Sequence, residues 1–81
     1  MIYDGVWQAL KSSILEVLPV KSEHTLQPEE SLRQLGANSI DRAEIIMLTM
    51  ARLELKIPLI EFSQAKNIAS LIDIFLTHAK A

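Results

Sequence analysis

Ser39 is the side chain of this 81-residue sequence with the clearest capacity for chemistry. It follows the loop segment Gly36-Ala37-Asn38 and precedes a stretch with helical periodicity, so its hydroxyl is expected at the start of a helix. A helix N-terminus presents unpaired N–H groups and partial positive charge, which favour a phosphate. A phosphodiester on the Ser39 hydroxyl would therefore be tolerated, and the glycine-containing loop would leave a modifying enzyme room to approach.

The surroundings of Ser39 do not predict catalysis. A serine nucleophile needs a neighbouring general base, and neither His24 nor His78 lies near Ser39 in the sequence. The two histidines also lack companions at metal-ligand spacing, so we predict no catalytic residue and no metal site. The chain has no cysteine and hence no thiol of its own. The residues alone leave open whether Ser39 is modified or is only a helix cap, because serine is among the commonest N-cap residues.

Apolar residues at spacings of three and four predict an all-α fold. Alternation of period two is never sustained, so no strand is expected. We expect main helices over about Asp4–Leu18, Ser39–Glu54 and Ile68–His78, and a short helix around Ile60–Gln64. The expected N-caps are Asp4, then Asn38 or Ser39, and finally Asn67.

A long connection over residues 19–38 separates the first two predicted helices. It is punctuated by Pro19, Pro28 and Gly36, and a loop of this length in a small domain is usually functional. We expect a helical turn over Glu29–Leu32. Leucines are expected to hold the connection to the core, together with one apolar stripe on each main helix. These core residues are Leu26, Leu32 and Leu35; Val6, Leu10, Ile14 and Val17, with Trp7 and Leu18 beside them; Ile45, Ile46, Thr49 and Leu53; and Ile68, Leu71, Ile72 and Phe75.

Length and composition point to a single domain over residues 1–81 whose stability comes from apolar helix packing. Hydrophobic residues make up 49% of the chain, and the formal net charge is −2. Without clustered Lys and Arg, and without a basic recognition helix, a nucleic-acid partner is not expected. The sequence has no signal-peptide pattern and no apolar run approaching the ~20 residues of a membrane-spanning helix. We therefore expect a cytoplasmic protein with no membrane association.

The segment Gly36-Ala37-Asn38-Ser39-Ile40 resembles the modification motif of acyl carrier proteins, Gly-x-Asp-Ser-Leu, at the start of their second helix. The similarity continues at Asp41 and Glu44, at Ile57-Pro58, and at Asn67-Ile68-Ala69-Ser70-Leu71. The resemblance implies an acyl-carrier-protein-like four-helix bundle of three main helices and one short one, with a long loop after the first helix.

This resemblance also implies a chemical role. Ser39 would receive 4'-phosphopantetheine from coenzyme A through a phosphopantetheinyl transferase. Acyl groups would then be held as thioesters on the thiol of the arm, so the chain would be a carrier and a substrate of other enzymes and not an enzyme itself. A non-catalytic helical interaction domain is the alternative from another class, and it would need neither Ser39 nor the long loop.

The sequence departs from the common family pattern at the predicted partner surface. Asn38 replaces the usual Asp, and Ile40 to Glu54 holds three acidic and two basic residues, a net charge of −1, where fatty-acid carriers are strongly acidic. Apolar side chains on this helix favour partner contact, clearly for Ile40 and Met47, whereas Met50 is equally consistent with the core. The predicted partner-binding residues are Asn38, Ile40, Asp41, Arg42, Ala43, Met47 and Met50.

The run from Gly36 to Ile45 is also similar to free-standing donor carriers of polyketide β-branching cassettes. That similarity implies a monomeric carrier, in antibiotic-type polyketide biosynthesis, whose cargo is an acetyl group. Its partners would be a hydroxymethylglutaryl (HMG) synthase-like enzyme, an acyltransferase and a decarboxylating ketosynthase. A general fatty-acid or polyketide synthase carrier is the alternative within the same class.

Overall fold

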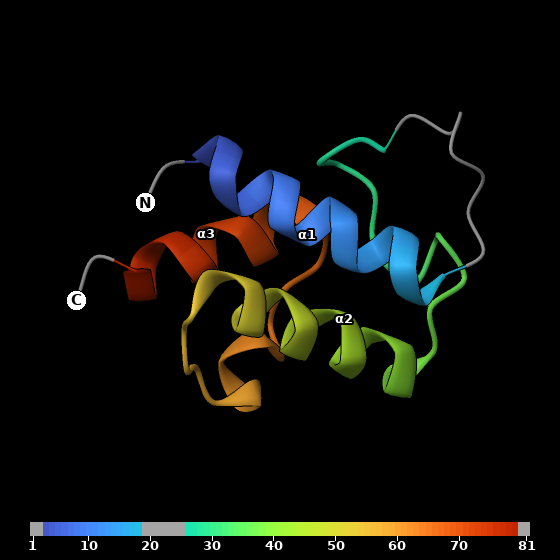
Figure 1. The fold of residues 1–81 in the computed structure, drawn as a ribbon. Helices are drawn as coiled ribbons and strands as arrows, with labels where there is room; N and C mark the ends of the chain where they lie inside the picture. Colours follow the sequence, from blue (N-terminus) through green and yellow to red (C-terminus); the bar gives the residue numbers. More distant parts are fainter. Residues whose placement is uncertain (1–2, 19–25, 80–81) are drawn as a thin grey trace.

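The computed structural model describes residues 3–18 and 26–79. Over these ranges the chain forms α1 (Tyr3–Val17), α2 (Ser39–Leu53), the 3-10 helix η1 (Leu59–Phe62) and α3 (Ile68–Ala79), with no strand. α1 packs against both α2 and α3, and η1 packs against α3 (Figure 1). The predicted all-α bundle of three main helices and one short helix is confirmed.

The arrangement of the helices places the start of α2 apart from the start of α1 and the end of α3. The beginning of α1 and the end of α3 lie at one end of the bundle, and α2 begins at the opposite end (Figure 1). The described part of the connection before α2, residues 26–38, leads to that same end. Residues 19–25 of this connection, including the predicted helix-stopping Pro19, lie outside the described residues.

Two local predictions are wrong in detail. Asp4 does not precede the first helix, because α1 already begins at Tyr3, and Asp4 lies in its first turn. The helical turn predicted over Glu29–Leu32 is replaced by two turns: the Glu30 N–H donates to the Gln27 carbonyl at 3.0 Å, which closes the first, and the second spans residues 32–36. Ser31 and Gln34 explain the second turn, since they form a reciprocal capping pair: the Gln34 N–H donates to Ser31 Oγ at 3.0 Å, and the Ser31 N–H donates to Gln34 Oε1 at 2.9 Å.

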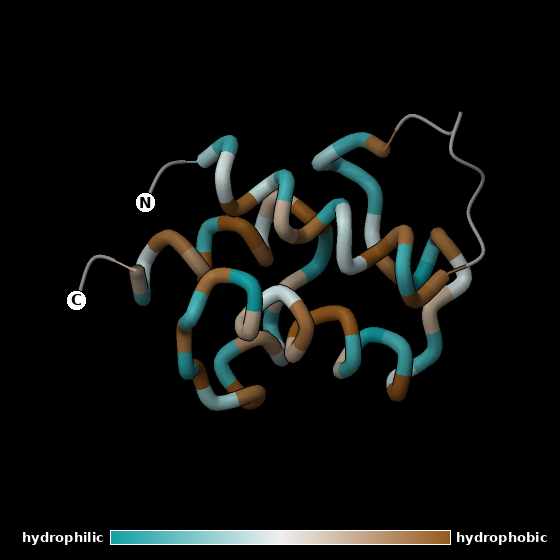
Figure 2. Tube along the Cα trace, in the orientation of Figure 1, coloured by the Kyte–Doolittle hydropathy of each residue, from teal (hydrophilic) through white to brown (hydrophobic). Residues whose placement is uncertain are grey.

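The hydrophobic core follows the predicted stripes. Apolar (brown) stretches recur between polar (teal) ones along the helices in Figure 2. Val17, Leu35 and Leu53 are only partly buried, as is Trp7. The buried apolar residues are Val6, Leu10, Ile14, Leu18, Leu26, Leu32, Ala37, Ile45, Ile46, Ile57, Phe62, Ile68, Leu71, Ile72 and Phe75.

A buried polar contact joins α1 to α2 within this core. Thr49 Oγ1 lies 2.9 Å from Ser13 Oγ and 2.7 Å from the Ile45 carbonyl oxygen, and its single proton can be donated to either. Ser13 Oγ donates to the Ala9 carbonyl and accepts from Arg52 at 2.8 Å. Every buried hydroxyl in this contact therefore has a partner, which removes the desolvation cost of placing it in the core.

The loop before α2 is held against α3 by backbone hydrogen bonds. The Ile68 N–H donates to the Glu30 carbonyl at 2.8 Å, and the Ala69 N–H donates to the Pro28 carbonyl at 2.9 Å. These two N–H groups belong to the first turn of α3, where a helix has no acceptor of its own. The loop therefore satisfies the end of one helix while it positions the start of another.

Candidate functional site

A short turn leads the chain into Ser39. Gly36 has a φ of 97°, in the left-handed region that glycine adopts at little cost. The next residue, Ala37, is buried, and its N–H donates to the Leu32 carbonyl at 3.0 Å. The turn is thus fixed on its core side, and Ser39 follows as the first residue of α2 with an exposed side chain.

Asn38, and not Ser39, caps α2. Asn38 Oδ1 accepts the Asp41 N–H at 2.7 Å, and the Asp41 carboxylate accepts the Asn38 N–H at 3.3 Å, which completes a capping box. Among the described residues, Ser39 Oγ has no hydrogen-bond partner. The sequence left the cap open between these two residues, and the structure assigns it to Asn38. The Ser39 hydroxyl therefore has no structural task at the helix terminus.

The predicted partner residues fall into two groups. Ile40 is 76% exposed and Met47 is 55% exposed. The two lie seven residues apart, so they share one side of α2. Asn38 is exposed, and Asp41, Arg42 and Ala43 are half-buried. Met50 differs, because it packs against the core and its sulfur accepts the Ile57 N–H at 3.3 Å.

Two exposed apolar residues on η1 were missed by the sequence analysis. Leu59 is 44% exposed and Ile60 is 76% exposed. Both follow Pro58, which immediately precedes η1, and the Glu61 N–H donates back to the Pro58 carbonyl. A signal was present in the sequence, since three apolar residues near a proline cannot all face inward in so short an element. Only the coordinates show which of them face outward.

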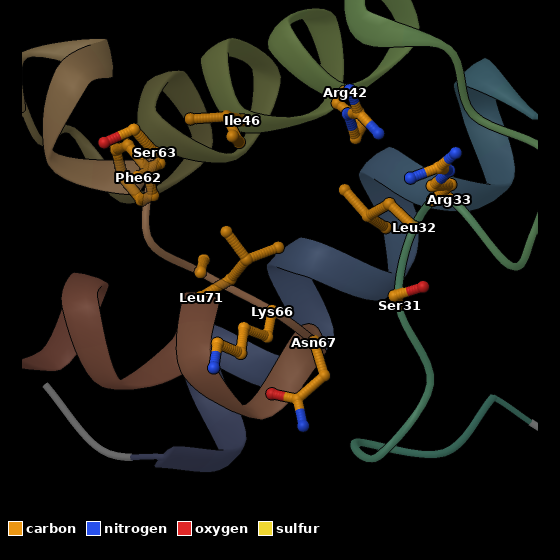
Figure 3. A pocket seen from close by; sticks show the side chains of 11 residues that line it. Ser31, Leu32, Arg33, Arg42, Ile46, Phe62, Ser63, Lys66, Asn67 and Leu71 are labelled. Atoms are coloured by element: carbon orange, nitrogen blue, oxygen red, sulfur yellow. The ribbon is translucent and has the colours of Figure 1, made fainter.

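A pocket of about 410 Å³ opens beside the first turns of α2 (Figure 3). Residues of the loop, α2, η1 and α3 line it, including Arg33, Arg42 and Lys66. Arg42 was predicted to lie on the partner surface, and no role was predicted for Arg33 or Lys66. No local pattern links these three residues, because they come from separate segments that only the tertiary fold brings together.

The first turn of α2 fits a covalently attached phosphate. The hydroxyl of Ser39 is exposed and free to form a phosphodiester, and the helix terminus supplies partial positive charge. Arg42 lies three residues further along the helix, a spacing at which side chains are neighbours. Asp41 is the acid nearest in sequence to Ser39, and its carboxylate is engaged by the Asn38 N–H. Ser39 would thus hold the group, with Arg42 beside it.

Within residues 3–18 and 26–79, no three His, Cys, Asp or Glu side chains come close enough together to hold a metal ion. The helices of those ranges are also too short or too polar to cross a membrane.

Comparison with known proteins agrees with this geometry. A family model described as the phosphopantetheine attachment site matches residues 8–75. The chain is 46% identical over 69 residues to the polyketide biosynthesis acyl-carrier-protein AcpK of Bacillus subtilis (strain 168), covering 85% of this chain and 84% of that protein. It also matches a chain in the crystal structure of the curacin biosynthetic pathway HMG synthase in complex with its acetyl donor-ACP. That match has a TM-score of 0.87 and 42% identity, and covers 95% of this chain and 99% of the other.

The bundle and its exposed helix-terminal serine define a carrier protein, one that holds acyl groups on 4'-phosphopantetheine and is not itself a catalyst. The chain belongs to the phosphopantetheine attachment site family. The resemblance drawn from the sequence is thereby confirmed for the family, the fold and the cofactor.

Proposed function

We propose that Ser39 carries the 4'-phosphopantetheine arm and that the protein donates an acetyl group to an HMG synthase-like enzyme during polyketide β-branching. The observation that carries the attachment is the Ser39 hydroxyl, which is exposed and has no hydrogen-bond partner among the described residues. It lies at a helix start that a different residue already caps. The donor role is supported by the similarity to a chain crystallised with an HMG synthase.

When bound, the arm supplies a terminal thiol that forms thioesters with acyl groups. The protein's own residues supply position. Asn38 fixes the first turn of α2, so that Ser39 is held in one orientation at the end of the bundle. The buried Ala37 and the left-handed Gly36 set the direction from which the chain enters this turn. The attachment point thus belongs to the capped end of α2, and we assign the mobility required for delivery to the arm.

The docking surface that we propose consists of Ile40 and Met47, with Ala43, Asp41 and Arg42 beside them. The buried centre of an interface is more apolar than its rim and is enriched in methionine, which adapts to irregular partner surfaces. The charge of this docking surface is nearly balanced, which favours recognition by shape and apolar contact over long-range electrostatic steering. Met50 contributes mainly to the core.

The carrier also depends on enzymes that modify it and load its arm. A phosphopantetheinyl transferase modifies the protein, as membership of the family requires. An acyltransferase and a decarboxylating ketosynthase prepare the acetyl cargo, and the protein acts in the cytoplasm as a single monomeric domain over residues 1–81.

Attachment is tested by intact mass after incubation with coenzyme A, magnesium and a broad-specificity transferase. The wild type is expected to gain one phosphopantetheine, and Ser39→Ala none. Ser12→Ala is a matched control, because Ser12 is another exposed helical serine and should leave the gain unchanged. Circular dichroism establishes that each variant is folded. Full modification of Ser39→Ala would place the arm on another residue.

The donor role is tested by supplying the acetyl-loaded protein to an HMG synthase-like enzyme together with a β-ketoacyl acceptor on a second carrier. Consumption of the acetyl group supports the proposal. A fatty-acid ketosynthase should use the same protein poorly. Equal use by both enzymes would instead favour a general fatty-acid or polyketide carrier.

A further inference from the structure

The pocket beside α2 combines an apolar floor with a cationic rim. Its floor is formed by buried side chains from four segments of the chain (Figure 3). A volume of about 410 Å³ lies within the range of small-molecule sites. The floor residues are Leu32, Ile46, Phe62 and Leu71.

Three of the eight Lys and Arg residues of the chain line this one pocket, and no Asp or Glu does. Arg33 and Arg42 lie on one side, and Lys66 extends from the opposite side next to Asn67 (Figure 3). Within the described ranges, none of the three forms an ion pair with a carboxylate. Such a concentration of positive charge in a chain of net charge −2 favours an anionic ligand.

The pocket begins within one helical turn of the proposed attachment point. Arg42 follows Ser39 by three residues and Ile46 follows Arg42 by four. Each of these pairs therefore consists of neighbours on the surface of α2. Arg42 is on the pocket rim and Ile46 is on its floor. A flexible arm on Ser39 can therefore fold back so that the acyl group at its end reaches the cationic rim.

We propose that this pocket binds the free carboxylate of a dicarboxylic acyl group, such as malonyl, carried on the arm. A guanidinium can bind a carboxylate through two parallel hydrogen bonds, which Arg42 and Arg33 are placed to offer. An acetyl group has no charge for the rim to hold. The inference rests on attachment at Ser39 and adds a preference among cargoes.

This preference would fit a donor that receives a dicarboxylic acyl group and delivers an acetyl group. In that conversion the carboxylate leaves as carbon dioxide and a proton takes its place on the carbon. The product has lost the group that the rim binds, so the arm is released for transfer.

The test compares protein loaded from malonyl-, succinyl-, acetyl- and butyryl-coenzyme A with the unacylated, arm-bearing protein. Intact mass establishes loading first, so a failure of attachment is seen separately from a failure of pocket binding. The readout is the NMR chemical shift of the Arg33 and Arg42 side-chain Nε–Hε groups and of the pocket backbone amides. Malonyl and succinyl should shift these signals, and acetyl should leave them close to those of the unacylated form.

Variants assign the effect to the rim. Arg42→Gln should reduce the ratio of docked to undocked malonyl arm by about tenfold, the loss expected for one charge-assisted hydrogen bond. Lys56→Gln is the matched control, because Lys56 is an exposed cation that does not line this pocket, and it should change nothing. Raising the ionic strength should weaken malonyl docking in the wild type.

Three results would overturn the inference. If the arm alone shifts both arginines and malonyl adds nothing, the cations bind the phosphodiester. If acetyl shifts the pocket as strongly as malonyl, the carboxylate is not what is recognised. If butyryl gives the largest shift, the pocket is an alkyl site.

Discussion

Replacing Asn38 by alanine removes the side chain that caps α2 while leaving the backbone bond to Asp41 in place. The lost interaction is the short 2.7 Å hydrogen bond from the Asp41 N–H. Loss of an Asn cap typically costs about 1 kcal/mol, within a range of about 0.5–2 kcal/mol. For a domain of this size, 1 kcal/mol lowers the melting temperature by roughly 4–8 °C. Ser39→Ala removes a hydroxyl without partners among the described residues, so it should change stability by less than about 0.5 kcal/mol.

The assay is denaturant unfolding followed by circular dichroism and by the fluorescence of the single tryptophan, Trp7. Asn38→Asp is a matched control, because an aspartate caps as well as an asparagine and should retain most of the stability. The opposite ranking would refute the reasoning. If Ser39→Ala costs about 1 kcal/mol and Asn38→Ala costs nothing, then Ser39 is the cap and its hydroxyl is not free.

The remaining predictions concern the core, the docking surface and the turn. Thr49→Val should cost roughly 1 kcal/mol by breaking the buried link between α1 and α2, whereas Thr77→Val removes a similar hydroxyl bond at an exposed site and should cost little in the same unfolding assay. Met47→Glu should leave the unfolding midpoint nearly unchanged and reduce acetyl transfer to the HMG synthase-like enzyme. Leu15 on α1 is comparably exposed, and Leu15→Glu should leave acetyl transfer unchanged. If Met47→Glu unfolds the protein, Met47 belongs to the core. Gly36→Ala should cost about 1 kcal/mol because of the left-handed backbone there, and an unchanged melting temperature would contradict that assignment.

Periodicity predicted the helices and most of the core because those features depend on neighbours three and four residues apart. Ile68, Leu71 and Ile72 are buried as their spacing indicates. Asn67 is confirmed as a cap of α3, since its Oδ1 accepts the Ser70 N–H at 2.9 Å. Helical spacing and N-cap residues depend only on residues close together in the sequence, so the sequence alone is enough to predict them.

The cap of α2 and the cationic pocket could not be derived in the same way. Asn38 and Ser39 are both good caps, and only the position at which helical geometry begins decides between them. Arg33, Arg42 and Lys66 belong to three segments whose proximity depends on tertiary packing. The turn after Ser31 could not be located from Pro28 alone, because the reciprocal hydrogen bonds of Ser31 and Gln34 start a turn of their own.

The most direct test of the central claim is to locate the arm within the sequence. Trypsin cleaves after Arg33 and Arg42, and the peptide between these sites, Gln34–Arg42, contains one hydroxyl side chain, that of Ser39. After modification with coenzyme A and digestion, mass spectrometry should find one phosphopantetheine on this peptide and none on the others. A phosphopantetheine on any other peptide, with Gln34–Arg42 unmodified, would contradict the assignment of Ser39.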